Sequence, residues 1–176
     1  IGDVAVAQSD PELVWVGTGE AQPRYAGYAY PGAGGFKSTD GGGSWTGMGL
    51  EETHHIAKVL IHPTNPDVVL VAAMGRQWSP NRERGVYRTA NGGRTWEQVL
   101  FVDDSTGVVD LVMDPTNPDL LLAWSWTIEQ GTSGGLHRSS DGGRTWRRIS
   151  RGLPGGLLGR AGLDFATSRR GVVYLF

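Results

Sequence analysis

Acidic, basic and aromatic side chains gather in a few loop-like stretches of this 176-residue chain. The candidate ligand-binding residues are Glu20, Arg24, Tyr25, Glu51, His54, His55, Arg76, Trp78 and Trp126. Rigid aromatic rings beside arginine and glutamate suit the stacking of a sugar or the docking of a peptide, because they combine apolar area with polar groups that fix orientation. These side chains therefore predict recognition of a peptide, a protein or a glycan.

Carboxylates in the same stretches offer a second chemistry, the hydrolysis of a glycosidic bond. A glycoside hydrolase needs two carboxyl groups across the bond, about 5 Å apart for retention or roughly 6.5–9.5 Å apart for inversion. Glu20, Glu51, Glu52 and Asp103 are available, but the sequence does not give the distances between them. No catalytic residue is assigned, and hydrolysis stays the alternative to binding.

An eight-residue sequence motif occurs three times in the chain, and the structure that it forms must position these loops. Residues 38–45, 89–96 and 139–146 all fit Ser/Thr-x-Asp/Asn-x-Gly-x-Ser/Thr-Trp. Their tryptophans, Trp45, Trp96 and Trp146, are 51 and 50 residues apart, a spacing typical of repeat architectures. Asp or Asn can accept bonds from backbone N–H groups one or two residues ahead, and glycine supplies positive φ angles. Each phrase therefore predicts a hairpin turn, with its tryptophan packed over the turn and against its neighbour.

The phrase resembles the Asp-box, also called the bacterial neuraminidase repeat, of sialidases, sortilin-type receptors, xyloglucanases and a photosystem II assembly factor. The sequence of residues 53–56 and 61–67 is most similar to that of bacterial sortilin-like proteins, which are often labelled glycosyl hydrolases. This resemblance implies a β-propeller, with the Asp-boxes at blade edges and away from any catalytic centre. It does not extend to the arginine triad of sialidases or to the catalytic aspartates of xyloglucanases.

Each repeat holds four short apolar or alternating segments divided by turn residues, which is the pattern of a four-stranded blade. We expect an all-β partial propeller of about three and a half antiparallel blades, at residues 1–50, 51–102, 103–152 and 153–176. Closed propellers have about four to eight blades, and an open one leaves unpaired strand edges. The chain is therefore predicted to be part of a longer propeller, and the alternative is self-association that closes the ring.

Two columns of charge recur along the repeats. Asp3, Lys58, Asp110 and Arg160 are predicted to share one position on the four first strands, which line the channel. The column is interpreted as a structural charge ladder, with a polar ligand site as the alternative. Lys37, Arg88 and Arg138 precede the boxes and are predicted to be solvated surface. Turns after the first and third strands should share one face, so the binding residues belong to the opposite, long-loop face.

The adjacent His54 and His55 would point to opposite sides of an extended chain, and no third metal ligand clusters with them. We expect one histidine at the channel mouth and the other packed or solvated, with no metal or cofactor.

The amino-acid composition limits the classes of partner that the chain is expected to bind. The net charge of −2 and the pI near 6.1 argue against nucleic acid, and the absence of cysteine leaves no thiolate metal ligand. No apolar run is long enough to predict a membrane span, and no signal peptide is visible. The predicted location is extracellular or periplasmic.

Overall fold

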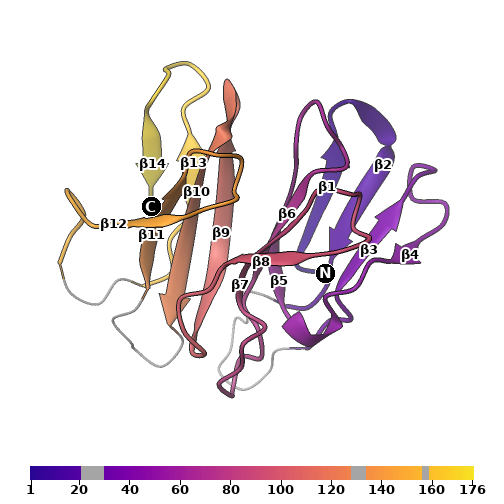
Figure 1. Ribbon diagram of the computed structural model, residues 1–176, viewed down its shortest axis with the longest axis horizontal. Coiled ribbons are helices and arrows are strands. Elements are labelled where there is room, and N and C mark those ends of the chain that lie inside the picture. Colours follow the sequence, from indigo (N-terminus) through magenta and orange to yellow (C-terminus); the bar gives the residue numbers. More distant parts are fainter. Residues whose placement is uncertain (21–29, 128–133, 156–158) are drawn as a thin grey trace.

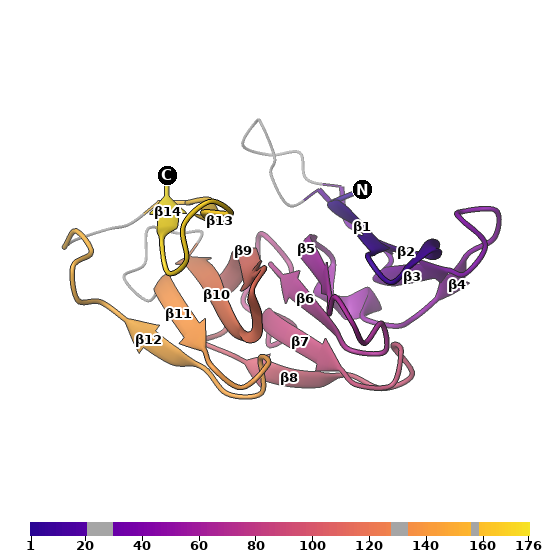
Figure 2. The same ribbon diagram turned by 90° about the horizontal axis from the view of Figure 1, so that it is seen from above.

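The computed structural model describes residues 1–20, 30–127, 134–155 and 159–176. Within them, the chain forms three four-stranded antiparallel sheets and one two-stranded sheet, which we call blades 1 to 4. In every blade the strands are hydrogen-bonded in chain order, so each blade is a simple meander. Figure 1 shows the blades side by side. In Figure 2 they fan into an arc, with the first strands β1, β5, β9 and β13 along its concave side.

The strands are as follows. Blade 1 contains β1 (Asp3–Ala7), β2 (Asp10–Gly17), β3 (Gly35–Ser38) and β4 (Thr46–Gly47). Blade 2 contains β5 (Ile56–Ile61), β6 (Val69–Ala73), β7 (Gly85–Thr89) and β8 (Glu97–Leu100). Blade 3 contains β9 (Thr106–Asp114), β10 (Asn117–Thr127), β11 (Gly135–Ser139) and β12 (Arg147–Ile149). Blade 4 contains β13 (Leu163–Phe165) and β14 (Val173–Leu175), and the short 3₁₀ helix η1 (Glu51–Thr53) joins blades 1 and 2.

Hydrophobic cores lie between successive blades rather than within one sheet. Strand β6, of sequence VLVAA, is buried along its whole length because blade 2 is covered on both faces. The cores contain Trp15 with Val71 between blades 1 and 2, Leu70 with Leu121 between blades 2 and 3, and Trp124 with Phe165 between blades 3 and 4. Each blade therefore depends on its neighbours for burial of its apolar side chains.

The three Asp-boxes are hairpin turns with the same internal bonds. In the first box, Oδ1 of Asp40 accepts a hydrogen bond from the Ser44 N–H at 2.8 Å, and Oγ of Ser38 accepts one from the Gly42 N–H at 2.9 Å. The same two bonds recur in the other boxes at 3.0–3.1 Å. The predicted hairpin is correct, but the aspartate bond spans four residues rather than one or two. Gly41 and Gly42, with φ of 65° and 96°, curl the chain back far enough to make that bond.

The tryptophans of the three Asp-boxes differ in the carbonyl to which the indole N–H donates a hydrogen bond. Nε1 of Trp96 donates to the Met48 carbonyl of blade 1 at 2.7 Å, which is the expected lock to the neighbouring blade. Trp45 and Trp146 instead donate to glycine carbonyls of their own boxes, both at 3.1 Å. Trp146 still packs against the core between blades 2 and 3, whereas Trp45 is 44% exposed.

The column before the boxes is not solvated surface, so that prediction was wrong for Arg88. Arg88 is 8% exposed, and its Nε donates to the Gly142 carbonyl of blade 3 at 2.9 Å. Nζ of Lys37 lies 5.7 Å from the ring centroid of Trp15, and Lys37 and Arg138 are both half-buried. The box of the following blade folds over this position, which a sequence of one blade does not reveal.

Candidate ligand-binding site

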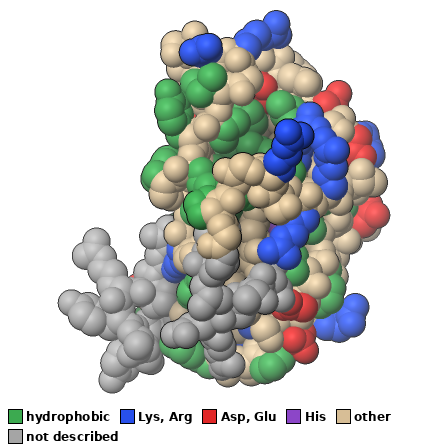
Figure 3. Space-filling model, turned by 90° about the vertical axis from the view of Figure 1, so that its left-hand side faces the viewer, with side chains coloured by type: hydrophobic (Ala, Val, Ile, Leu, Met, Phe, Trp, Pro, Cys, Tyr) green, Lys and Arg blue, Asp and Glu red, His purple; other side chains and the backbone are tan. Residues whose placement is uncertain are grey.

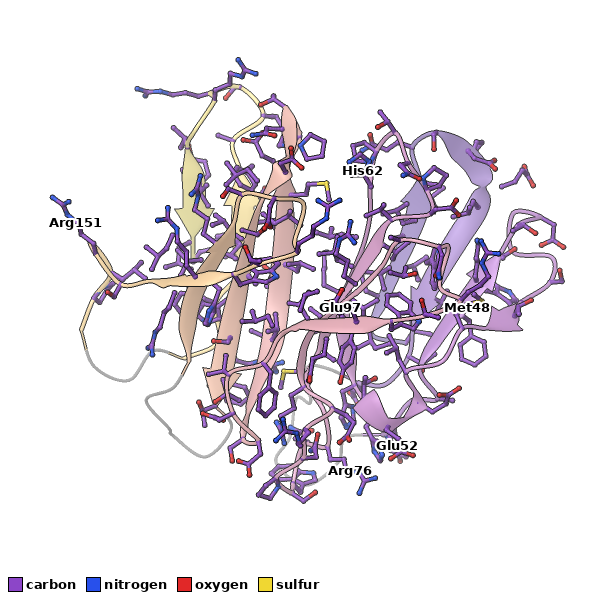
Figure 4. All side chains as sticks on the ribbon, in the orientation of Figure 1. Met48, Glu52, His62, Arg76, Glu97 and Arg151 are labelled. Atoms are coloured by element: carbon purple, nitrogen blue, oxygen red, sulfur yellow. The ribbon has the colours of Figure 1, made fainter. Side chains whose placement is uncertain are left out.

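The two faces of the blades differ as expected. The N–H groups of Gly41, Gly92 and Gly142 in the boxes donate to backbone carbonyls at 2.9–3.1 Å. Each of these carbonyls lies in the turn before the second strand or in the first residues of that strand. The boxes and these turns therefore share one face. The long-loop face, which we define as residues 18–20, 30–34, 50–55, 74–84 and 101–105, lies at the other end. Figure 4 shows the separation, with His62 at one end and Glu52 and Arg76 at the other.

Arg84 braces the loop of residues 74–84 from within. The side chain is 2% exposed, and its guanidinium donates to the carbonyls of Met74 at 2.8 Å, Ser79 at 2.9 Å and Arg76. Burial lowers the pKa of Arg84, and Asp103 and Asp104 oppose that shift. A buried guanidinium that binds three carbonyls fixes the path of the loop. The fold therefore uses Arg84 as a support for the loop.

The braced loop displays polar and aromatic groups to solvent. Trp78 is 58% exposed, and Nη2 of Arg76 lies 2.6 Å from Oε2 of Glu52 in an exposed ion pair. Tyr30, on the loop of blade 1, is 73% exposed, and its carbonyl accepts a hydrogen bond from the Glu20 N–H at 3.1 Å. An indole, a phenol and an ion pair are thus presented on one face.

The two histidines link the loops of blades 1 and 2. His54 follows η1 with φ of 56°, and its carbonyl accepts a hydrogen bond from the Gly32 N–H at 2.6 Å. The His55 carbonyl accepts one from the Met74 N–H at 2.8 Å. His55 is 4% exposed, and burial, followed by the charge of His54, lowers its pKa, while Glu20 opposes the shift. One histidine is therefore packed and the other half-buried.

Metal binding finds no support in the described part of the chain. Its histidines and carboxylates form no group of three that could hold an ion.

A central groove of about 510 Å³ runs along the first strands. Asp3, Lys58 and Asp110 line it in the predicted order. Oδ2 of Asp3 accepts a hydrogen bond from the Val59 N–H at 2.8 Å, and Nζ of Lys58 lies 3.9 Å from the same oxygen. Oδ2 of Asp110 accepts one from the Leu163 N–H at 2.6 Å. Both carboxylates therefore tie a blade to the next one, as a structural ladder would.

Arg160 does not occupy the fourth place of this column. The pairing Leu163↔Leu175 in blade 4 matches Val59↔Val71 in blade 2, so Gly162 takes the position of Lys58. Arg160 reaches the groove from the segment before β13, where its Cζ lies 5.0 Å from the ring centroid of Trp126. The predicted position was wrong because the turn of blade 4 lacks the proline that marks the other turns, although its paired residues Leu163 and Leu175 are as far apart in the sequence as Val59 and Val71.

The predicted binding residues fall into separate places. Glu20, Glu51, His54, His55, Arg76 and Trp78 lie on the long-loop face, at blades 1 and 2. Trp126 lies near the end of β10, half-buried beneath Arg160. Arg24 and Tyr25 fall outside the described residues. The sequence analysis considered Glu52 only as a carboxylate for hydrolysis, and it had no signal for the pairing of Trp126 with Arg160.

The displaced carboxyl pKa values belong to the opposite face. Hydrogen bonds, first from the Ser44 hydroxyl, lower the pKa of Asp40 to about 2. Hydrogen bonds, first from the Thr145 hydroxyl, also lower the pKa of Asp141, and the Thr116 N–H lowers the pKa of Asp114. A general acid needs a raised pKa, so these groups are shifted in the wrong direction for that role.

Comparison with known proteins bears on the fold. A GH74 enzyme described as ancestral matches with a TM-score of 0.75 at 18% identity, covering 99% of this chain and 21% of that one. The GH74 xyloglucanase from Xanthomonas campestris matches with a TM-score of 0.56 at 20% identity, covering 88% and 24%. The chain thus spans a quarter or less of either enzyme. No curated protein matches the sequence. No helix among the described residues is long and apolar enough to cross a membrane.

The family model for Sortilin, neurotensin receptor 3 (Sortilin-Vps10) matches residues 35–156, which is more than half of the chain. Together with the solved structures, this match confirms the predicted all-β architecture, a partial propeller of four-stranded blades. The chain belongs to the Sortilin-Vps10 family of β-propeller proteins.

Proposed function

We propose that this chain is part of a β-propeller binding module that recognises a peptide, protein or glycan ligand on its long-loop face. Trp78 carries the proposal, because its indole is 58% exposed on a loop that buried Arg84 holds in place. An aromatic ring on a braced loop loses little conformational freedom when a ligand stacks on it. Exposed rings of this kind are typical anchors of binding sites.

Polar groups around Trp78 supply the fixing contacts. The Arg76–Glu52 ion pair is exposed, so a ligand can compete for either partner at little cost in protein stability. Glu20, Glu51 and His54 contribute from the neighbouring loops, and buried His55 supports them through its carbonyl, which accepts a hydrogen bond from the Met74 N–H. Arg24 and Tyr25 remain candidates of the first loop, and Trp126 contributes from blade 3 together with Arg160.

The names of the related proteins suggest two probes. The family is named after a receptor of the peptide neurotensin, and one structural neighbour is a xyloglucanase. We would titrate the protein with neurotensin and with a xyloglucan oligosaccharide and measure the heat of binding. We expect one of them to bind, and Trp78→Ala to weaken that binding by roughly tenfold or more.

Trp45→Ala is the matched control, because Trp45 is also exposed but lies in an Asp-box on the opposite face. It should leave the affinity unchanged. Equal losses in the two variants, or binding that ignores Trp78, would contradict the proposed site. An extracellular or periplasmic location stays a prediction.

Hydrolysis is the competing outcome of the same titration. If xyloglucan is cleaved, and cleavage is lost in Glu20→Gln or Glu51→Gln while binding persists, the module is a glycoside hydrolase.

A further inference from the structure

A cleft of about 310 Å³ lies where the first Asp-box meets the second, between blades 1 and 2. Its lining comes from β3, β4, the two boxes and the turn before β6, so it is separate from the central groove and from the long-loop face. Met48, labelled in Figure 4, marks its place. Its polar lining includes Lys37, Thr39, Thr46, Asp67, Asn91 and Arg94. The volume lies at the lower end of the range of ligand pockets, roughly 300–1,000 Å³.

Lys37 brings a half-buried positive charge to this cleft. Its Nζ lies 5.7 Å from the ring centroid of Trp15, and it makes no hydrogen bond or ion pair with any residue that the structure describes. Arg88 precedes the second box as Lys37 precedes the first, but its Nε donates to the Gly142 carbonyl of the next blade. An ammonium has three donors, and a charge that is partly withdrawn from water is costly unless it is paired. Lys37 therefore offers its donors to a ligand.

Arg94, in the second box, brings another positive charge to the same cleft. Its Nε donates to the Asn91 carbonyl at 3.0 Å, which fixes the side chain against its own box. In the third box, Nη1 of Arg144 donates to the Asp141 carbonyl at 2.7 Å, whereas the Nη groups of Arg94 bond to none of the described residues. A free guanidinium fork matches two oxygens of a sulfate or phosphate group. Arg94 is thus positioned to bind an oxyanion.

Asn91 keeps a negative charge out of the cleft. The other two boxes have Asp40 and Asp141 at this position, and the hydroxyl four residues later donates to the carboxylate. In the second box the hydrogen bond has the opposite direction, because Nδ2 of Asn91 donates to Oγ1 of Thr95 at 2.8 Å. The second box therefore presents amide and hydroxyl donors where the other boxes present a carboxylate.

The remaining charges favour an anion. Lys37 and Arg94 contribute two positive charges to the lining and Asp67 one negative charge, which leaves a net charge of +1. The residues at the same repeat positions between blades 2 and 3 are Arg88, Arg144, Asp119 and Asp141. Their two positive and two negative charges cancel. The boundary between blades 1 and 2 therefore differs from the next one both in its net charge and in its unused donors.

We propose that this cleft binds a tetrahedral oxyanion, a sulfate or phosphate group, as a free ion or as an ester on a saccharide. Nζ of Lys37 and the Nη groups of Arg94 bind the oxygens of the anion. The hydroxyls of Thr39 and Thr46, which are both exposed, contact the group that carries it. The site is independent of the proposed ligand site on the long-loop face.

Amide NMR of the intact protein tests the proposal with inorganic sulfate, which replaces chloride at constant ionic strength. The signals of Gly92 and Arg94 should shift and reach saturation. Lys and Arg side chains also lie at the opposite end of the molecule, which Figure 3 views and where Figure 4 labels Arg151. Sulfate that only accumulates near positive charge would shift the Arg151 signal as much as that of Arg94, without saturation, and this result would overturn the proposal.

Three variants separate loss of the site from loss of the fold. Asn91→Asp introduces the residue that the other boxes already contain, so the box should fold, yet sulfate should bind about tenfold more weakly or worse. Arg94→Gln should weaken binding to a similar extent, whereas Arg144→Gln, the same change in the next box, is the matched control and should leave the affinity unchanged. Unchanged affinity in Asn91→Asp, or equal losses in the two arginine variants, would overturn the proposal.

A sulfated galactose, compared with galactose, distinguishes the two sources of the anion. Tighter binding of the ester than of inorganic sulfate would assign the cleft to a sulfated saccharide, and weaker binding of the ester would assign it to the free ion. Both results support an oxyanion site. Equal binding of galactose and its sulfate ester would mean that the cleft recognises the sugar rather than the anion, which overturns the proposal.

Discussion

Nε2 of His137 lies 2.9 Å from Oγ of Ser125, and both side chains are buried where blade 3 meets blade 2. His137 occupies the position that Phe36 holds in blade 1 and Tyr87 in blade 2. Burial, assisted by the positive charge of Arg148, lowers the pKa of His137 to about 4. The blade interface therefore holds a neutral imidazole that resists protonation.

This histidine should make stability depend on pH. At pH values between the ordinary histidine pKa of 6.5 and the folded pKa of about 4, His137 is protonated in the unfolded chain but neutral in the folded chain. The free energy of unfolding should therefore fall by about 3 kcal/mol as pH drops through that window, and stay unaffected above it. His137→Phe should remove this part of the pH dependence, measured by urea unfolding at pH 7 and pH 4.5. An unchanged difference between the two pH values would count against the assignment.

The contact between Trp15 and Gly93 should tolerate no side chain. Gly93→Ala places a methyl group against the Trp15 ring and 2.9 Å from Cε of Met48, at φ of 90°. We expect a loss of about 2–4 kcal/mol from overpacking and backbone strain together. Gly152→Ala is the control, with φ of 84° and no other atom within 4 Å, so only strain, about 1 kcal/mol, should remain. Urea unfolding compares the two, and equal losses would refute the packing argument.

The second Asp-box has asparagine where the others have aspartate. Asn91→Asp should raise Tm at pH 7, because the new carboxylate would accept the bonds that lower the pKa of Asp40 to about 2 and that of Asp141 as well. A carboxyl with a lowered folded pKa stabilises above its unfolded pKa of 3.8 and loses that effect as pH falls through the folded value. The gain should thus vanish near pH 2. Asp141→Asn should show the opposite change in thermal melts at the same two pH values.

Two arginines of one loop should respond differently to the same substitution. Arg84→Lys removes a buried fork that binds three carbonyls, so we expect a loss of about 2–3 kcal/mol and faster trypsin cleavage after Arg82. Arg76→Lys disturbs an exposed ion pair and should change stability by less than about 0.5 kcal/mol. Similar effects of the two substitutions would contradict the role given to Arg84.

The fold was predictable where its causes are local. Ser38, Asp40 and the glycines between them and Trp45 make their bonds within one turn, so eight residues suffice to predict a hairpin. The channel order of Asp3, Lys58 and Asp110 followed from counting between turns. These features repeat because each blade solves the same local problem.

The rest depends on partners about fifty residues away in the sequence. The burial of Arg88 rests on the Gly142 carbonyl of the following blade. Arg160 was misplaced because the turn of blade 4 lacks the proline by which the other turns were aligned. The positive φ of His54 and the bracing of residues 74–84 by Arg84 belong to irregular loops without a periodic signal. The face that bears the candidate residues was predictable, but the internal geometry of that face was not.

The contacts between blades have a direction. Trp15 of blade 1 lies against Gly93 in the box of blade 2, and Leu70 of blade 2 lies against Gly143 in the box of blade 3. During synthesis on the ribosome, the side chain of Trp15 or Leu70 is therefore exposed until roughly the next fifty residues, which form the following blade, emerge. The same rule constrains evolution. An insertion within one repeat would move the box glycine away from the large apolar side chain that it contacts. The gain or loss of a whole repeat preserves each of these contacts. Duplication of entire blades is thus the change in length that this architecture accepts most readily.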